Sequence, residues 1–305
     1  MAEAYSIPLV TDSDQALLRL GRLLRESGYR FTTITPASHA RVNARAANAE
    51  ARTLRDVFGW NRPFSADVLP TEMLELLLDA DATLDVDGAM RSRVRFSTAG
   101  ELLFVHSAFP TVESDAVFFG PDTYRYLSLL RRMNPRAKRA VDVGCGSGAG
   151  GILIAPHCER VVLADVNPKA LRYAAINAQL NGVENVECVE SDVLRGVQGD
   201  YDLVISNPPY LVDDLARTYR DGGGRFGEGL SLEIARQSVG SRLILYTATA
   251  IVEGVDTFRA AVEPIATGRR MRYEELDPDV FGEELEREAY AETDRLAVVA
   301  LELGP

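Results

Sequence analysis

A rigid polar turn is the segment of this sequence whose residue types are best suited to chemistry. Residues 203 to 210 read Leu-Val-Ile-Ser-Asn-Pro-Pro-Tyr, so a short apolar run leads straight into Asn207, Pro208, Pro209 and Tyr210. Two successive prolines fix φ and keep Asn207 out of helical geometry. We therefore expect the Asn207 side chain and the nearby carbonyl groups to be held in one orientation at the end of a buried strand.

This turn suits a planar nitrogen as the reacting group. An amide, aminopurine or guanidine nitrogen is a weak nucleophile because its lone pair is delocalised. Fixed acceptors for its N–H groups favour the pyramidal geometry in which it reacts. The predicted acceptors are the Asn207 Oδ1 atom and the Pro208 carbonyl, and Tyr210 is predicted to stack on the flat group.

A glycine-rich turn is predicted to bind a nucleotide-like cofactor. Residues 141 to 148 read Val-Asp-Val-Gly-Cys-Gly-Ser-Gly, between a predicted strand and a predicted helix. Glycines at such a turn let the backbone approach a ligand closely. Because Gly144, Gly146 and Ala149 also satisfy the relaxed dinucleotide fingerprint, a nicotinamide-dependent oxidoreductase is an alternative at this point.

Three carboxylates around this turn favour a different nucleotide. Asp165 ends the second predicted strand, where a carboxylate accepts hydrogen bonds from ribose hydroxyls, and Asp192 ends the third, where it suits the exocyclic amine of an adenine. Asp142 precedes the first glycine by two residues and would face a cationic amino group or a sulfonium, which a dinucleotide lacks. The alternative is that Asp165 and Asp192 only cap the helices that follow.

In this order and combination, the motifs resemble those of class I S-adenosylmethionine-dependent methyltransferases. The resemblance is to the Asn-Pro-Pro-Tyr amino-methyltransferase branch, which contains release-factor glutamine methyltransferases and adenine amino-methyltransferases, and it covers about residues 117 to 303. It implies S-adenosylmethionine as cofactor and N-methylation as the reaction. The catalytic residues that it implies are Asn207, Pro208, Pro209 and Tyr210. The cofactor-binding residues that it implies are Phe119, Thr123, Asp142, Gly144, Gly146, Gly148, Asp165, Asn167, Asp192, Val193 and Asn207.

The elements that must position these residues alternate between strand and helix from residue 139 onward, which predicts parallel strands joined by right-handed crossovers. Seven strands are predicted, at residues 140–143, 160–164, 186–189, 203–205, 242–246, 271–275 and 295–303. The fold class is thus α/β, with a Rossmann-like seven-stranded mostly parallel sheet and a smaller N-terminal α+β domain.

The N-terminal domain is predicted to span residues 1–116 and to recognise the substrate, and the methyltransferase domain is predicted to span residues 117–305. In the first domain, helical patterns cover residues 12–28, 41–58 and 70–79, and residues 91–97 and 101–107 are a predicted hairpin. In the second, Pro121 is predicted to begin a helix that runs to about residue 133.

Composition indicates a globular chain of 305 residues, because 46% hydrophobic content supports a substantial core. The absence of a long apolar run and of a signal-peptide pattern predicts a cytoplasmic protein without a membrane partner. The three cysteines and three histidines are scattered without metal-ligand spacing, so no metal site is predicted.

The acceptor is predicted from charge. The net charge of −12 disfavours an extended nucleic-acid footprint. Acidic residues follow the Asn-Pro-Pro-Tyr turn and favour an amide or guanidine, either in a small metabolite such as an arginine-like amino acid or in a protein side chain; they are Asp213, Asp214, Asp221, Glu228 and Glu233. The alternative is an adenine amino group in RNA or DNA, with phosphates contacted by arginines within residues 19–62.

Overall fold

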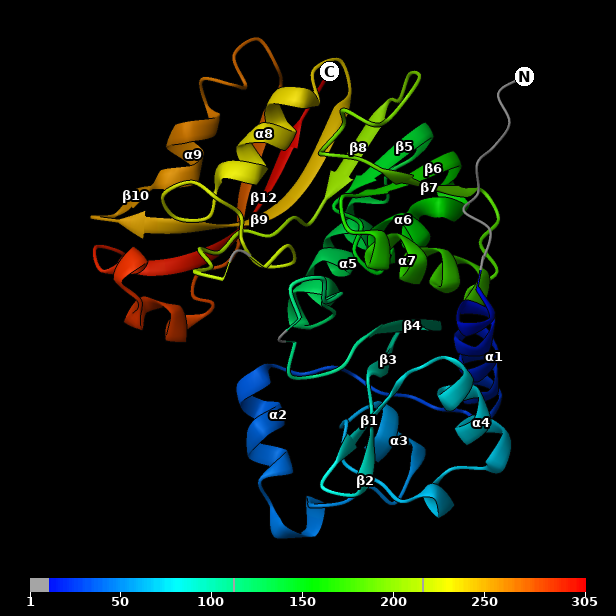
Figure 1. Ribbon diagram of the computed structural model, residues 1–305. Coiled ribbons are helices and arrows are strands. Elements are labelled where there is room, and N and C mark those ends of the chain that lie inside the picture. Colours follow the sequence, from blue (N-terminus) through cyan, green and yellow to red (C-terminus); the bar gives the residue numbers. More distant parts are fainter. Residues whose placement is uncertain (1–10, 112, 216) are drawn as a thin grey trace.

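A twisted central sheet forms the C-terminal part of the computed structural model, which describes residues 11–111, 113–215 and 217–305 (Figure 1). In spatial order, the sheet runs β11-β12-β9-β8-β5-β6-β7, and the short β10 pairs with β9. The strands are β5 (Ala137–Val143), β6 (Cys158–Asp165), β7 (Val186–Glu190), β8 (Leu203–Ser206), β9 (Arg242–Val252), β10 (Val255–Asp256), β11 (Met271–Asp277) and β12 (Arg295–Leu303).

The strand directions confirm the predicted fold class. Strands β7, β6, β5, β8 and β9 are mutually parallel, whereas β12 is antiparallel to both of its neighbours, β9 and β11. All seven predicted strands are present, and β10 is an addition. The chain order reverses at β5, which lies between β6 and β8. Ligands of open α/β sheets bind beyond the carboxyl ends of the strands at such a switch point.

Helices cover both faces of this sheet. One face packs against α5 (Pro121–Met133), α6 (Ala149–Ile154) and α7 (Pro168–Leu180), and the other packs against α8 (Gly229–Gln237) and α9 (Thr257–Val262) (Figure 1). The apolar runs of the parallel strands are therefore buried on both sides, as expected for such sheets.

The N-terminal part combines helices with two hairpins. The helices are α1 (Asp12–Glu26), α2 (Pro36–Asn43), α3 (Leu54–Phe58) and α4 (Thr71–Asp79), and the hairpins pair β1 (Thr83–Val86) with β2 (Ala89–Ser92) and β3 (Val94–Ala99) with β4 (Leu102–Ser107). The first hairpin was not predicted, although its Asp87-Gly88 turn has positive φ at both residues and is a standard hairpin signal.

The single helix predicted over residues 41–58 is wrong. Helix α2 ends at Asn43, and α3 begins only after Thr53, whose side chain accepts a hydrogen bond from the Asp56 amide. The Asn48 side chain donates to the Val42 carbonyl at 2.7 Å. Polar side chains therefore satisfy the backbone groups that a continuous helix would have used.

Helix α7 joins the two parts of the molecule. Its apolar side chains Ala170, Tyr173, Ile176 and Leu180 belong to the same buried cluster as the core of the N-terminal part. In addition, the α7 residue Arg172 donates to the buried carboxylate of Asp14 on α1 at 2.6 Å. The N-terminal part is thus held against the sheet domain by a shared core.

Candidate active site

A cavity of about 450 Å³ lies at the carboxyl ends of β5, β6 and β8, where the topology predicts a ligand site. This volume is in the range of small-molecule sites. Its walls include the glycine turn after β5, the residues after β6 and β7, and the turn after β8. Two motifs that are separate in the sequence are thus brought to one cavity.

The glycine turn takes a backbone form that other residues rarely adopt. Gly144 and Gly146 have φ of 63° and 53°. A Cβ at Gly146 would meet no atom within 4 Å, so the missing side chain leaves open space at the cavity wall. The Gly146 amide donates to Asp165 Oδ2 at 2.9 Å, and the other Asp165 oxygen accepts from the Asn167 amide at 2.9 Å. The turn and the end of β6 therefore hold each other.

Gly148 packs against a neighbouring helix and is not part of the cavity wall. Its φ is 75°, and a Cβ there would lie 3.1 Å from the Cβ of Ala174 on α7. The residue does not line the cavity. The absent side chain lets the turn pack closely against α7, and the cofactor-binding role of Gly148 stays a prediction.

Asp142 lies inside the cavity wall and is fully buried. Its Oδ2 atom accepts from the Gly151 amide at 2.7 Å. Burial raises its pKa to about 8, and the Gly151 amide opposes this shift only in part. A carboxyl group in this state is poised to ionise when a cationic group approaches.

Asp192 and Val193 line the same cavity beyond β7. Strand β7 ends at Glu190, so Asp192 belongs to the following turn rather than to the strand end. Its carboxylate is exposed and forms an ion pair with Arg195. Val193 is buried and has a φ of 54°.

The predicted cavity residue Phe119 is replaced by its neighbour. Phe119 is buried against Phe104 and stacks on His106 with ring centroids 5.2 Å apart, so it is part of a core and does not line the cavity. Phe118 lines the cavity instead, as does Thr123 at the start of α5. Adjacent residues in extended backbone point to opposite sides, and the sequence did not indicate which of two phenylalanines faces inward.

The Asn-Pro-Pro-Tyr turn forms another part of the cavity wall. All four of its residues line the cavity: Asn207, Pro208, Pro209 and Tyr210. Strand β8 is fixed there because the Ser206 hydroxyl donates to the Val143 carbonyl at 2.7 Å. The Asn207 side chain is half-buried and forms no hydrogen bond within the part of the chain that the structure describes. Its amide is therefore free to contact a ligand.

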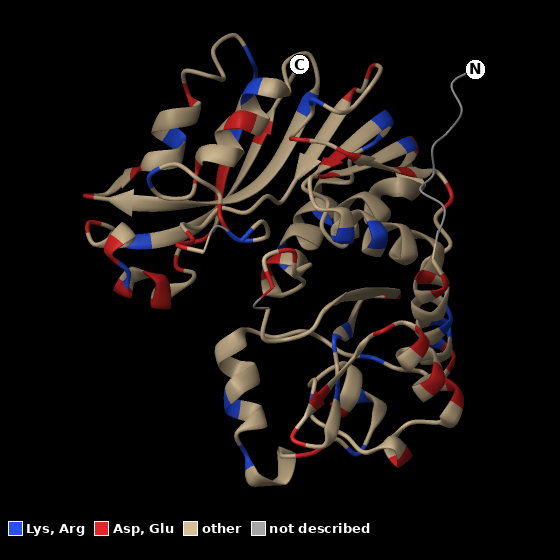
Figure 2. Ribbon diagram, viewed as in Figure 1, with Lys and Arg blue, Asp and Glu red and all other residues tan. Residues whose placement is uncertain are grey.

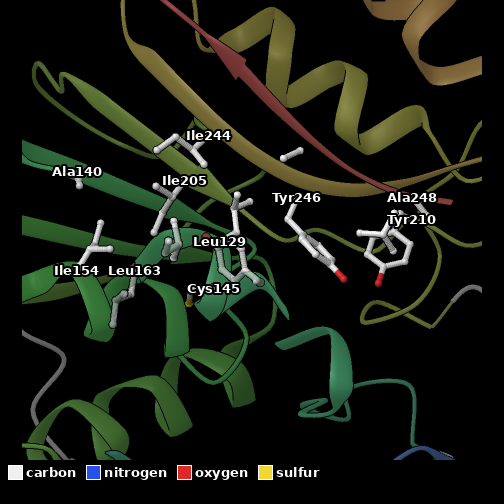
Figure 3. Close-up of a cluster of buried hydrophobic side chains, with 14 of the residues drawn as sticks. Leu129, Ala140, Cys145, Ile154, Leu163, Ile205, Tyr210, Ile244, Tyr246 and Ala248 are labelled. Atoms are coloured by element: carbon white, nitrogen blue, oxygen red, sulfur yellow. The ribbon is translucent and has the colours of Figure 1, made fainter. Parts of the chain in front are cut away.

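Tyr210 is more enclosed than its sequence position indicates. It is 8% exposed, and its ring centroid lies 6.3 Å from that of Tyr246 and 6.1 Å from that of Phe281 (Figure 3). Phe281 follows β11 and also lines the cavity, with a φ of 55°. A non-glycine residue with this φ is uncommon and is often found at functional sites. No local pattern in the sequence indicates this residue.

Two further segments belong to the cavity wall. Residues 116–118 and 217–221 both line it. They belong to chain segments that bind each other, because Thr218 Oγ1 donates to the Ser114 carbonyl at 2.9 Å, and the Phe118 and Tyr219 rings are nearly parallel with centroids 6.3 Å apart.

The acidic residues after the turn do not form the free acidic surround that the sequence predicted. Arg217 binds Asp213 through both carboxylate oxygens and lowers its pKa to about 2. Asp214 pairs with Arg287 at 2.7 Å. The other three accept hydrogen bonds from backbone amides or arginines: Asp221, Glu228 and Glu233. Arginines later in the chain neutralise much of this charge, so it is a weaker argument about the acceptor.

Known proteins resemble the part of the chain that builds this site. Residues 126–219 match the family model described as the methyltransferase small domain. Over these residues the chain is thus similar to a methyltransferase small domain. The match confirms the family predicted from the glycine turn and the Asn-Pro-Pro-Tyr turn, both of which lie inside it. It also resolves the ambiguity of the glycine pattern against a nicotinamide-dependent oxidoreductase.

Curated relatives of the methyltransferase domain include both protein and RNA methyltransferases. A release factor glutamine methyltransferase of Deinococcus radiodurans is 34% identical over 47% of this chain and 53% of its own length. A putative protein N5-glutamine methyltransferase of Methanocaldococcus jannaschii is 36% identical over 32% of this chain and 53% of its own length. A ribosomal RNA small subunit methyltransferase C of Cronobacter sakazakii is 36% identical over 27% of this chain and 25% of its own length. The chain thus spans between about a quarter and about half of each relative.

Among solved structures, Trm5 of Methanocaldococcus jannaschii in complex with adenosine overlaps with 70% of this chain and 55% of its own length, at 14% identity and a TM-score of 0.48. The strand order described above establishes the fold of the methyltransferase domain independently of this likeness. None of the helices in residues 11–111, 113–215 and 217–305 has the length and apolar content needed to cross a bilayer.

Proposed function

We propose that this protein transfers a methyl group from S-adenosylmethionine to the nitrogen of a carboxamide in a protein side chain. The observation that carries the proposal is the unpaired Asn207 amide, which lies in one cavity with the glycine turn and its carboxylates. The reaction needs one exchange of bonds: a carbon–nitrogen bond forms as a carbon–sulfur bond breaks, and the alkylated nitrogen then loses a proton to solvent.

The residues present fit S-adenosylmethionine, which when bound supplies a methyl group on a positively charged sulfur. Asp142 lies beside the glycine turn and would oppose the cationic methionine part. Asp165 keeps lone pairs for the ribose hydroxyls, because each oxygen accepts only one backbone bond. Asp192 and Val193 would contact the adenine. The Asp192 carboxylate is exposed and would meet its amino group, and the buried Val193 side chain would pack against its ring.

The chain acts on the acceptor chiefly by orientation. The Asn207 Oδ1 atom and the Pro208 carbonyl would accept the two N–H groups of a carboxamide, so that its lone pair points toward the methyl group. Positioning of this kind accounts for a large part of many rate enhancements, and it requires no strong general base.

A neutral acceptor agrees with the charges at this end of the cavity. The Asp122 carboxylate is paired with Arg125 at 3.1 Å, and the Arg220 guanidinium is paired with Glu284. Tyr210 and Phe281 present aromatic surface. A guanidinium would have to leave water, and the Asp122 and Asp213 carboxylates are already paired with arginines. The glutamine methyltransferases among the relatives favour the same acceptor class.

The experiment is a labelled-methyl transfer assay with three acceptor pools: glutamine- or asparagine-containing peptides and proteins, free amino acids including arginine, and total RNA. Mass spectrometry then identifies the methylated atom. Methylation of a side-chain amide supports the proposal. Methylation of free arginine or another small metabolite contradicts the acceptor class, and methylation of a carbon or oxygen atom contradicts the reaction.

A second candidate is methylation of an adenine amino group in RNA. Exposed arginines on and after α2 favour it, because Arg41 and Arg45 form no ion pair within the described ranges. Figure 2 shows basic segments, in blue, on and just after this helix. A ribosomal RNA methyltransferase is also among the relatives. RNA binding that weakens steeply with salt, and that R41E/R45E abolishes, would support it. No binding at low salt would exclude it.

A further inference from the structure

A buried carboxylate lies beside the Asn-Pro-Pro-Tyr turn and has no place in the chemistry above. Asp122 is the second residue of α5 and is 6% exposed. Its Oδ1 atom accepts from the Tyr246 hydroxyl at 3.0 Å, and the Tyr210 hydroxyl lies near enough to oppose the rise in the pKa of the carboxyl group. A helix, a central strand and the acceptor turn thus meet at one side chain.

The surroundings of Asp122 keep it in place. A carboxylate in this position needs several donors, because burial disfavours its charge and raises its pKa. Arg125, one turn further along α5, donates at 3.1 Å and also pairs with Asp277 at 3.2 Å. The carboxylate is therefore held by its own helix and is a fixed acceptor for the Tyr246 hydroxyl.

The Tyr210 side chain is restrained by the residues around it. Its ring packs between those of Tyr246 and Phe281. Figure 3 shows Tyr246 and Tyr210 next to each other with their hydroxyl groups turned to the same side. The Tyr246 hydroxyl donates to Asp122, so that ring is fixed, and the rings of Tyr246 and Phe281 limit the tilt of Tyr210.

We propose that Asp122 is a positioning residue, which fixes Tyr246 and, with the ring of Tyr246 and the nearby Tyr210 hydroxyl, holds the Tyr210 ring against the acceptor. This inference rests on the proposed function. It predicts that loss of the carboxylate affects the acceptor and leaves the cofactor site intact, because within the described ranges Asp122 forms no hydrogen bond with the glycine turn or Asp165.

A double-mutant cycle tests the inference, with Asp122→Asn, Tyr210→Phe and the double variant compared in methyl transfer and in S-adenosylhomocysteine binding. We expect each single change to lower kcat/KM for the acceptor at least about tenfold, since hydrogen bonds to charged groups contribute at this level. S-adenosylhomocysteine affinity should stay within about twofold of wild type. The kcat/KM of the double variant should be no lower than that of the less active single variant.

The matched control is Asp79→Asn, at the exposed end of α4, which should leave both quantities unchanged. If Asp122→Asn does not fold, Tyr246→Phe takes its place in the cycle with Tyr210→Phe. Tyr246→Phe removes the hydroxyl that donates to Asp122 and leaves the ring in place. The positioning role would be overturned if the two single changes lowered kcat/KM independently, so that their effects multiply in the double variant. A parallel loss of S-adenosylhomocysteine affinity, or an Asp122→Asn enzyme with unchanged kcat/KM, would overturn it as well. Absence of methyl transfer by the wild-type protein would instead overturn the proposed function, and this inference with it.

Discussion

The side-chain amide of Asn177 pairs with the backbone of Val105 as a neighbouring strand would. Its Oδ1 atom accepts from the Val105 amide at 2.7 Å, and its Nδ2 atom donates to the Val105 carbonyl at 3.0 Å. The same Nδ2 atom donates to the Ser147 carbonyl in the glycine turn at 2.9 Å. One side chain of α7 thus ties a hairpin of the N-terminal part to the loop beside the cavity.

Replacement of Asn177 by Ala should therefore destabilise the whole protein. Three buried backbone groups would lose their partner, and each such loss costs about 1–3 kcal/mol, so we expect a decrease of about 3 kcal/mol or more in the free energy of unfolding. Denaturant unfolding measures this decrease. The control is Gln179→Ala on the exposed side of the same helix, and a loss no larger than that of the control would contradict the role given to Asn177.

Replacement of Asn207 by Ala should separate chemistry from cofactor binding. Because its Oδ1 atom is assigned to the acceptor nitrogen, we expect turnover to fall by about 10²–10³-fold, as when one fixed hydrogen-bonding group is removed from an active site. S-adenosylhomocysteine affinity in calorimetry should remain near that of wild type. Equal losses of turnover and affinity would instead place Asn207 in the cofactor site alone.

Asp165 and Asp192 should differ in their effect on cofactor affinity. Asp165→Asn disturbs hydrogen bonds from the Gly146 and Asn167 amides as well as those expected from ribose, so we expect about 10–100-fold weaker S-adenosylhomocysteine binding. The Asp192 carboxylate is exposed, and Asp192→Asn should weaken binding by less than about fivefold. Titration calorimetry compares the two variants. The reverse order would show that the exposed carboxylate is the main anchor.

The buried Asp142 carboxyl should couple cofactor binding to proton release. Its pKa of about 8 lies above the ordinary value of about 4, so the group is protonated at pH 6.5 in the free protein. A bound cationic amino group would favour the carboxylate. We therefore expect affinity to rise with pH up to about 8. At pH 6.5, the binding enthalpy should depend on the ionisation enthalpy of the buffer, and in Asp142→Asn this dependence should disappear.

The same group has the opposite effect on the stability of the free protein. Between about pH 4 and pH 8 the folded protein retains a proton that the unfolded chain has released, so this contribution is present below the unfolded pKa and is lost as pH rises to the folded pKa. We expect the melting temperature to fall over this window by more in the wild type than in Asp142→Asn. Identical pH profiles would contradict the raised pKa.

Much of the cofactor site could be predicted from the sequence because its signals are local. A glycine turn after an apolar strand needs positive φ at Gly144 and Gly146, and two prolines restrict Asn207 whatever surrounds them. Carboxylates near the ends of successive parallel strands must meet at one edge of the sheet. Spacing along the chain is therefore enough to bring Asp165 and Asp192 to the same cavity.

The acceptor side could not be predicted in the same way. Phe281 and Tyr246 reach Tyr210 from elements far along the chain, and arginines such as Arg287 neutralise carboxylates that look free in the sequence. Burial and ion pairing between distant segments decided these features, and neither leaves a pattern at the residues concerned.

The sequence by itself determined the α/β fold, the cofactor turn and the kind of nitrogen chemistry, because these depend on periodicity, on backbone restrictions and on the order of motifs. Only the tertiary structure decided that Phe118 rather than Phe119 faces the cavity, that Asp213 and Asp214 after the turn are paired with arginines, and that Asp122 accepts from the Tyr246 hydroxyl. Each of these depends on which side chains are brought together by long-range packing, which local propensity does not encode.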